Sequence, residues 1–283
     1  MSQLLRQMRM KSNILKMKKI KKVFGSLTLI TALCLLFIGG CNKDDTPIHE
    51  ISYDLQVEDV LGVTGKVTFT EFESGTTTID VMLINSPVGT YATMLYSNTA
   101  LEKGPTVLTL QPVDESGESS TIITMMNYNQ LIAFDGHIKV LKSTDPDVIL
   151  AICDIGGNAV TPNKKSYLLN TVDVYGVSGN ALFEQRVNGN TLVTLTLTGM
   201  IAGETYPSTI NLGSIASMGG GPVVKTLSNV NGTSGIGYTN IRKLDSDIDI
   251  SYDNWLVYDG YINVYKTSVD LNNIISQGDI GSN

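Results

Sequence analysis

The chain has 283 residues, with 20 Lys or Arg, 27 Asp or Glu and three Cys. Residues 1–40 hold eight of the basic residues and no acid, so residues 41–283 have 12 basic and 27 acidic residues and a formal net charge of −15. Because nucleic acids and anionic headgroups are bound through Lys and Arg, this charge argues against a nucleic-acid partner.

A basic segment followed by an apolar stretch opens the chain. The apolar stretch, 27–38, is shorter than the about 20 residues that a membrane-spanning helix needs. The small residues Gly39 and Gly40 then lead into Cys41. We interpret residues 1–40 as a lipoprotein signal peptide that is cut before Cys41, whose thiol and new amino group carry lipid. The alternative is an uncleaved signal anchor, and either Met1 or Met17 could be the true start.

The acidic segment 41–48 follows as a linker. Its residues Asn42 to Asp45 resemble the export tag, one Lys with acidic residues, that follows the lipidated Cys in surface-exposed lipoproteins of some Gram-negative bacteria. A solvated linker is the alternative reading, since charge runs are usually solvated. Two or more acyl chains on Cys41 would give stable membrane attachment. We therefore expect a lipid-anchored, surface-exposed protein of the outer membrane, with the leaflet left open.

Residues 49–158 read as a first β domain. Apolar residues alternate along 79–83, which predicts a strand with one buried face. The dipeptide Ser74-Gly75 separates two such runs and predicts a hairpin turn. A short helical turn is expected at 129–134.

Residues 166–283 read as a second β domain, after a polar linker at 159–165 that contains a Pro. Val and Leu alternate with Thr along 193–198, and Asn188-Gly189 is a strong hairpin-turn signal. Further short helical turns are expected at 254–258 and 271–276.

The second domain repeats the first in order and approximate spacing. The matching segments are 62–69 with 176–183, 104–110 with 221–227, 131–140 with 256–264, and 154–158 with 279–283. A period above 100 residues indicates two domains, because solenoid repeats run to about 20–50 residues. The fold class expected is all-β: two tandem antiparallel Greek-key sandwich or barrel domains with short helical turns.

Each repeat resembles a CHRD domain, the type named after chordin and common in bacterial secreted proteins. The resemblance rests on the Gly-x-x-x-Phe strands at 65–69 and 179–183, the Asp-Gly-Tyr-Ile-Asn-Val strand at 259–264, and the terminal Gly-Asp-Ile-Gly at 278–281. It implies a non-catalytic module for binding, adhesion or scaffolding. A weaker resemblance to the Greek-key barrel of Cu/Zn superoxide dismutase concerns the fold alone.

The positions at which the family carries metal-binding His residues depart from its pattern. A His-x-His pair places both rings on one face of a strand, which suits a metal ion. Those positions here are Met94, Tyr96 and Leu141 in the first repeat and Thr209, Asn211 and Tyr265 in the second. We therefore expect no metal, no cofactor and no catalytic residue.

The remaining reactive residues are few. His49 falls in the linker, and we expect His137 to be a half-exposed strand residue. Cys34 leaves with the signal peptide and Cys41 carries lipid, so Cys153 has no intramolecular partner. It lies in an apolar run, and we expect a buried, inert thiol.

Two function classes compete with the non-catalytic surface module, whose partner would be an unknown protein or glycan. A metal-dependent enzyme of superoxide dismutase type is disfavoured by the His count. A glycan-binding lipoprotein would need exposed aromatic residues, whereas Tyr252, Trp255 and Tyr258 are expected to pack under a short helix. The acidic segment 245–253 stays open: alternating Asp on a strand could bind Ca²⁺, or the segment could simply be solvated.

Overall fold

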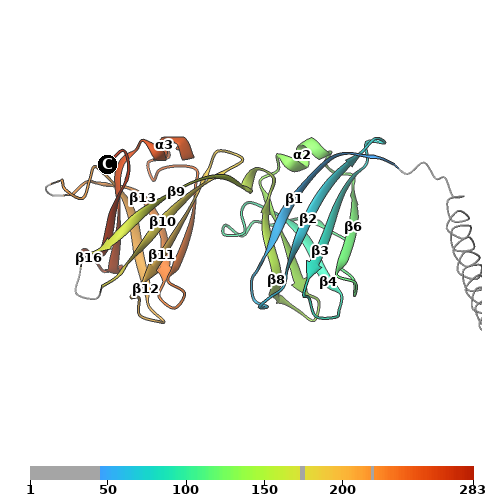
Figure 1. Cartoon of the computed structure of the whole chain (residues 1–283), viewed down its shortest axis with the longest axis horizontal. Coiled ribbons are helices and arrows are strands. Elements are labelled where there is room, and N and C mark those ends of the chain that lie inside the picture. The colour runs from blue at the N-terminus through green and yellow to red at the C-terminus, as the bar shows by residue number, and fades with distance from the viewer. Residues whose placement is uncertain (1–44, 173–175, 218–219) are drawn as a thin grey trace, which may run out of the picture. The chain divides into compact units, whose positions relative to one another are not determined.

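The computed structural model describes residues 45–172, 176–217 and 220–283. Cys41, the proposed signal peptide and most of the acidic linker lie outside the described residues. The described chain forms a compact unit from Pro47 to Asn283 that contains two antiparallel β sheets (Figure 1). The all-β prediction is therefore confirmed.

The first sheet is open and has eight strands. Their order is β5-β4-β7-β8-β1-β2-β3-β6, so β5 and β6 are its edges. The strands are β1 (Pro47–Val57), β2 (Thr64–Phe72), β3 (Thr77–Ile84), β4 (Tyr91–Ser97), β5 (Thr106–Thr109), β6 (Glu118–Ile123), β7 (Gly136–Lys142) and β8 (Asp145–Ile155). The short helix α2 (Tyr128–Ile132) links β6 to β7.

The second sheet closes into a barrel. Its order is β10-β11-β14-β13-β12-β15-β16-β9. The strands are β9 (Val160–Thr171), β10 (Ser178–Arg186), β11 (Thr191–Thr198), β12 (Thr205–Leu212), β13 (Val223–Asn231), β14 (Ile236–Ile241), β15 (Asp259–Thr267) and β16 (Asp270–Gly281). A 3₁₀ turn, η1 (Gly156–Asn158), precedes β9, and helix α3 (Tyr252–Leu256) precedes β15.

The two strand orders correspond strand for strand, each strand of the first sheet matching the one eight places later in the second. The sheets differ where the barrel closes. In the second sheet β13 has nine residues and pairs with β14 at Asn231 and Ile236. In the first, β5 has only four residues and is flanked by Pro105 and Pro112. Pro222 precedes β13 just as Pro105 precedes β5, so the difference lies at Pro112, which has no N–H to donate at the position where β13 continues.

Each core is built by the alternation that the sequence predicts. In the first sheet Val81 and Ile79 pair across from Val67 and Phe69, and all four are buried.

The glycine of the Gly-x-x-x-Phe motif allows two strands to approach closely. A Cβ on Gly65 would lie 2.0 Å from the carbonyl oxygen of Met82 on β3. The same approach, 2.0 Å to the oxygen of Thr196, recurs at Gly179 in the second sheet.

The helices expected at 129–134 and 254–258 are confirmed as α2 and α3, and each begins with a capping box, at Asn127 and at Ser251. The helical turn expected at 271–276 is wrong, because this segment is part of β16 and pairs with β15. The polar segment 159–165, expected as a linker, is largely strand: β9 begins at Val160 and pairs with β10. Polar residues suit that strand because most of it is exposed.

A buried arginine connects β10 to the end of β8. Arg186 is 1 % exposed, and its Nη1 donates to Asp154 Oδ2 at 2.7 Å and to the carbonyl oxygen of Asn158. The Asn188-Gly189 hairpin turn lies beside it, with Gly189 at a φ of 85°. The Asn188 amide donates to Asp135 Oδ1 at 2.9 Å, and its backbone N–H donates to the oxygen of Gly157. The junction between the two sheets is therefore hydrogen-bonded on several sides.

Candidate functional site

The positions that the sequence resemblance marks as replaced metal ligands in the second repeat come together as a buried polar network. Thr209 and Asn211 lie on one face of β12, which pairs with β15. Thr209 Oγ1 donates to Asn211 Oδ1 at 2.7 Å, and the Tyr265 hydroxyl on β15 lies 2.9 Å from Thr209 Oγ1. Because the Thr209 proton is directed at Asn211, Tyr265 is the donor to Thr209. All three residues are buried.

The network extends at both ends. Asn263 Nδ2 donates to the Tyr265 hydroxyl at 3.3 Å, and Asn211 Nδ2 donates to the Gly221 oxygen at 3.0 Å. One polar atom is left over: Asn263 Oδ1 is buried and has no hydrogen-bond partner among the described residues. These are hydroxyl and amide groups, and none of them is an imidazole, thiolate or carboxylate. Mutual hydrogen bonding satisfies nearly all of them, as buried polar groups require.

The matching positions of the first sheet form a different cluster. Tyr96 on β4 donates its hydroxyl to Met94 Sδ at 3.3 Å and stacks on His137 of β7, with 5.0 Å between the ring centroids. Lys139 Nζ lies 4.9 Å from the centroid of the Tyr96 ring. Leu141 lies further along β7, where it pairs with Ala92 and is buried. Thus Met94 and Tyr96 are in contact, and Leu141 contributes only an aliphatic side chain two residues from Lys139, the register partner of Met94.

His137 is fully buried, which corrects the expectation of a half-exposed side chain. Its Nδ1 lies 2.9 Å from the Asn98 oxygen and is therefore the protonated nitrogen. Burial lowers the pKa of His137, and the nearby Lys139 charge acts in the same direction. Its Nε2 has no partner among the described residues. The described residues contain no group of three His, Cys, Asp or Glu side chains that could hold a metal ion.

His49 lies within β1 instead of a linker, where its Nδ1 is 2.8 Å from Glu71 Oε2. Cys153 is buried, as predicted, and its burial raises the pKa of the thiol far above the usual range.

Trp255 is fully buried and contacts Phe183, with 6.0 Å between ring centroids. Tyr252 is buried as well. These two aromatic side chains therefore belong to the core and offer no exposed platform for a sugar.

Of the two readings left open for the segment 245–253, the strand with alternating Asp on one face is not formed: 245–248 make a turn, Asp249 forms an isolated bridge with Lys243, and Asp253 lies in α3. Lysine side chains pair with its carboxylates. Lys243 Nζ lies 2.8 Å from Asp247 Oδ1, and Lys225 Nζ lies 3.1 Å from Asp245 Oδ1. These carboxylates are arranged around lysine ammonium groups instead of converging on a common centre.

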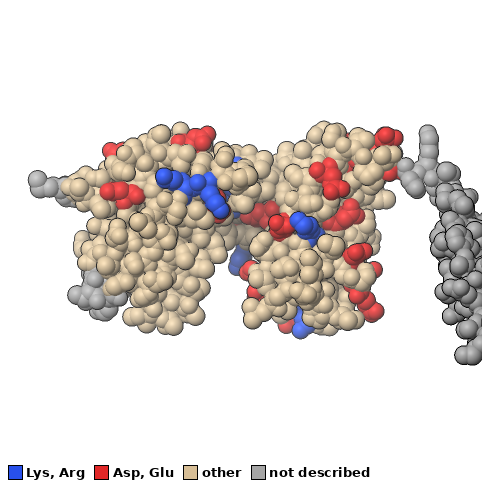
Figure 2. All heavy atoms as spheres, in the orientation of Figure 1, with Lys and Arg blue, Asp and Glu red and all other residues tan. Residues whose placement is uncertain are grey.

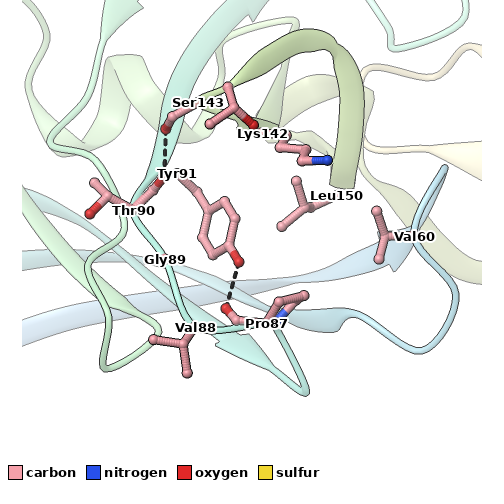
Figure 3. A pocket seen from close by; sticks show the side chains of 10 residues that line it. Val60, Pro87, Val88, Gly89, Thr90, Tyr91, Lys142, Ser143 and Leu150 are labelled. Carbon is pink, nitrogen blue, oxygen red and sulfur yellow. Dashed lines mark hydrogen bonds between the residues drawn. The ribbon is translucent and has the colours of Figure 1, made fainter.

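A cavity of about 320 Å³ lies at one end of the first sheet, and sequence reasoning missed it. It opens where the β1–β2 loop, the β3–β4 loop and the β7–β8 turn meet (Figure 3). The lining residues are Val60, Pro87, Val88, Gly89, Thr90, Tyr91, Lys142, Ser143, Thr144 and Leu150. They come from separate stretches of the chain, so no local motif marks the site.

Hydrogen bonds hold the three loops around the cavity. Asp59 donates its backbone N–H to the Ile149 oxygen at 2.9 Å, and its Oδ2 accepts from the Ile149 N–H at 2.7 Å. The Tyr91 hydroxyl donates to the Pro87 oxygen at 2.5 Å, and Ser143 Oγ donates to the Thr90 oxygen at 2.5 Å. The cavity is therefore preformed, as most small-molecule sites are.

Uncharged residues cover most of the face viewed in Figure 2, and the acidic side chains on it are dispersed around both sheets. The few basic side chains on this face gather in a short cluster on the second sheet and beside acidic ones on the first, and they do not run along the length of the face. No helix in the described part of the chain is long and apolar enough to cross a bilayer.

Comparison with known proteins adds no relative. No family model, no curated protein and no solved structure matches the chain. Its function therefore has to be inferred from the chemistry of the residues described above.

Proposed function

We propose that this chain is a non-catalytic, lipid-anchored outer-membrane protein whose two CHRD-like β domains act as a binding, adhesion or scaffold module at the cell surface. The observation that supports it most is the network of Thr209, Asn211 and Tyr265. Catalytic Zn²⁺ and Cu²⁺ sites use His with Cys or carboxylate ligands. Here neutral groups occupy the equivalent positions, and they are already hydrogen-bonded to one another.

The first sheet supports the same proposal. Its equivalent positions hold a thioether, a phenol and an aliphatic side chain, and the nearby His137 is buried against Tyr96. A lone neutral imidazole cannot form a metal site that usually needs three protein ligands. The preformed cavity at the end of this sheet, in contrast, is suited to binding a small molecule without chemistry.

Anchoring through Cys41 can be tested directly. Cys41→Ser should leave an unprocessed precursor that stays out of the detergent phase on phase partition, whereas the parent protein enters it. Cys34→Ser is the matched control, since that Cys lies inside the proposed signal peptide and should not matter. A Cys41→Ser variant that still partitions as a processed, lipidated protein would refute the anchor.

Surface exposure requires a separate experiment. Protease added to intact cells should digest the parent protein. Replacing Lys43, Asp44 and Asp45 together by Ala should protect it, if these residues act as the export tag. Equal digestion of both proteins would show that the acidic segment is only a solvated linker. Digestion of neither would contradict surface exposure.

A further inference from the structure

The cavity of the first sheet has apolar walls around buried floor residues. Leu150 is 2 % exposed and Tyr91 is 6 % exposed, while Val88 at the rim is 86 % exposed. The hydroxyls of Tyr91 and Ser143 are directed at backbone carbonyl oxygens within the site. Their hydrogen-bonding capacity as donors is therefore used, and the interior presents mainly carbon. Such a lining favours an aliphatic group.

One charged side chain lines the cavity. Lys142 extends over the opening toward Leu150 and Val60 (Figure 3). Among the described residues, Lys66, Lys225 and Lys243 form ion pairs with Asp side chains, but no acidic side chain lies within ion-pair distance of Lys142. An ammonium group with no acidic partner beside an apolar hollow is complementary to a ligand with one anionic end.

The size of the cavity limits the ligand further. A water molecule occupies about 30 Å³ of liquid, so 320 Å³ corresponds to roughly ten non-hydrogen groups of that size. This volume is at the lower end of the about 300–1,000 Å³ of small-molecule sites. A carboxylate with an aliphatic chain of about eight carbons has that size, whereas a long-chain lipid does not fit inside.

The cavity lies at the opposite end of β1 from the start of the compact unit. β1 starts at Pro47, six residues after Cys41, and the cavity residue Val60 follows its far end at Val57. A strand of 11 residues spans about 36 Å at about 3.3 Å per residue. The cavity therefore lies beyond the far end of β1, about one strand length from Pro47, where the compact unit begins.

We propose that this cavity binds short aliphatic monocarboxylates, with the chain against Leu150 and Tyr91 and the carboxylate at Lys142 Nζ. This inference rests on the proposed binding role and names its ligand class. The ammonium group forms a charge-assisted hydrogen bond to the carboxylate. The apolar walls remove the chain from water.

Titration of residues 47–283, which form one compact unit, with octanoate tests this proposal. Calorimetry should show saturable binding, and methyl and aromatic NMR signals of Val60, Val88, Tyr91 and Leu150 should shift. Octan-1-ol should bind roughly two- to fivefold more weakly, and octylamine more weakly still, because Lys142 repels it.

A lysine variant isolates the charge. Lys142→Met keeps the aliphatic stem and should weaken octanoate binding by roughly two- to fivefold, the usual size of one exposed ion pair. Octan-1-ol binding should hardly change. Lys164→Met, on exposed β9 of the second sheet, is the matched control and should bind octanoate as the parent does.

Several results would overturn the proposal. Absence of saturable octanoate binding would do so, as would equal affinity for octanoate and octylamine, or signal shifts confined to other parts of the protein. Equal octanoate binding by Lys142→Met and the parent would remove the role of the lysine. None of these results bears on the metal-free module proposed above, which fails instead if the protein holds a catalytic metal.

Discussion

Replacing Tyr265 by Phe removes one hydroxyl from the buried network of the second sheet and keeps the shape of the side chain. Two hydrogen bonds disappear, the 2.9 Å contact with Thr209 and the 3.3 Å contact from Asn263 Nδ2. Asn263 Oδ1 already has no partner among the described residues, so within them the variant leaves this buried amide without a hydrogen bond at either atom. A buried polar group left unpaired costs about 1–3 kcal/mol.

The free energy of unfolding should therefore fall by about 2–3 kcal/mol. The longer of the two bonds is the weaker one, which keeps the sum below the upper limit for two lost partners. For a unit of this size about 1 kcal/mol shifts Tm by roughly 2–4 °C, so Tm should fall by roughly 4–12 °C. Urea denaturation and calorimetry of residues 47–283 measure both quantities.

Tyr238→Phe is the matched control, because Tyr238 is 45 % exposed and its variant should unfold within about 0.5 kcal/mol of the parent. A double-mutant cycle of Tyr265→Phe with Thr209→Val should give a coupling energy above about 0.5 kcal/mol, as residues in one network do. If Tyr265→Phe unfolds like the parent and the cycle shows no coupling, the hydroxyls do not form the closed network described here.

Three further outcomes follow from single buried residues. Arg186→Met leaves Asp154 without its ion-pair partner and should lower the free energy of unfolding by about 2–4 kcal/mol in urea denaturation. Arg242→Met changes an exposed side chain and should leave the stability unchanged. Equal stabilities of the two variants would contradict the buried pair. Cys153 should resist iodoacetamide in the folded protein and react once the protein unfolds, and rapid labelling of the native protein would refute its burial. Because burial raises the pKa of the thiol in the folded state, the free energy of unfolding should fall as the pH rises above the unfolded pKa of about 8.5. Burial lowers the pKa of His137 in the folded state, so on acidification the unfolded chain takes up a proton at a higher pH than the folded chain does. The free energy of unfolding should therefore fall as the pH drops below about 6.5. If His137→Gln has the same pH dependence of stability as the parent, this reasoning is contradicted.

The elements that depend on neighbouring residues along the chain could be predicted from the sequence. The alternation at 79–83 and 193–198 identifies the buried strand faces, and Asn188-Gly189 identifies a hairpin turn. The helix before β15 has an apolar pattern and a capping box that are both local in sequence. Residues 271–276 mislead because Leu271, Ile274 and Ile275 have the i, i+3, i+4 spacing of a helix face, whereas pairing with β15 makes the segment a strand.

The features that depend on distant residues could not be predicted. His137 is buried because Tyr96, on a neighbouring strand, covers its ring. The cavity requires Val60, Pro87, Lys142 and Leu150 to meet, and nothing in any one of these segments indicates the others. Closure of the second sheet, but not the first, likewise depends on the length of one edge strand beside its neighbour.

Metal content and dismutation activity, measured together on residues 47–283 after supplementation with copper and zinc, test the central claim most directly. The non-catalytic module predicts less than one tightly bound copper or zinc ion per chain and superoxide decay no faster than in buffer. The reason is that Thr209, Asn211 and Tyr265 bind one another and supply no imidazole. Stoichiometric copper or zinc, with turnover well above buffer, would contradict the account and establish a metal-dependent enzyme in its place.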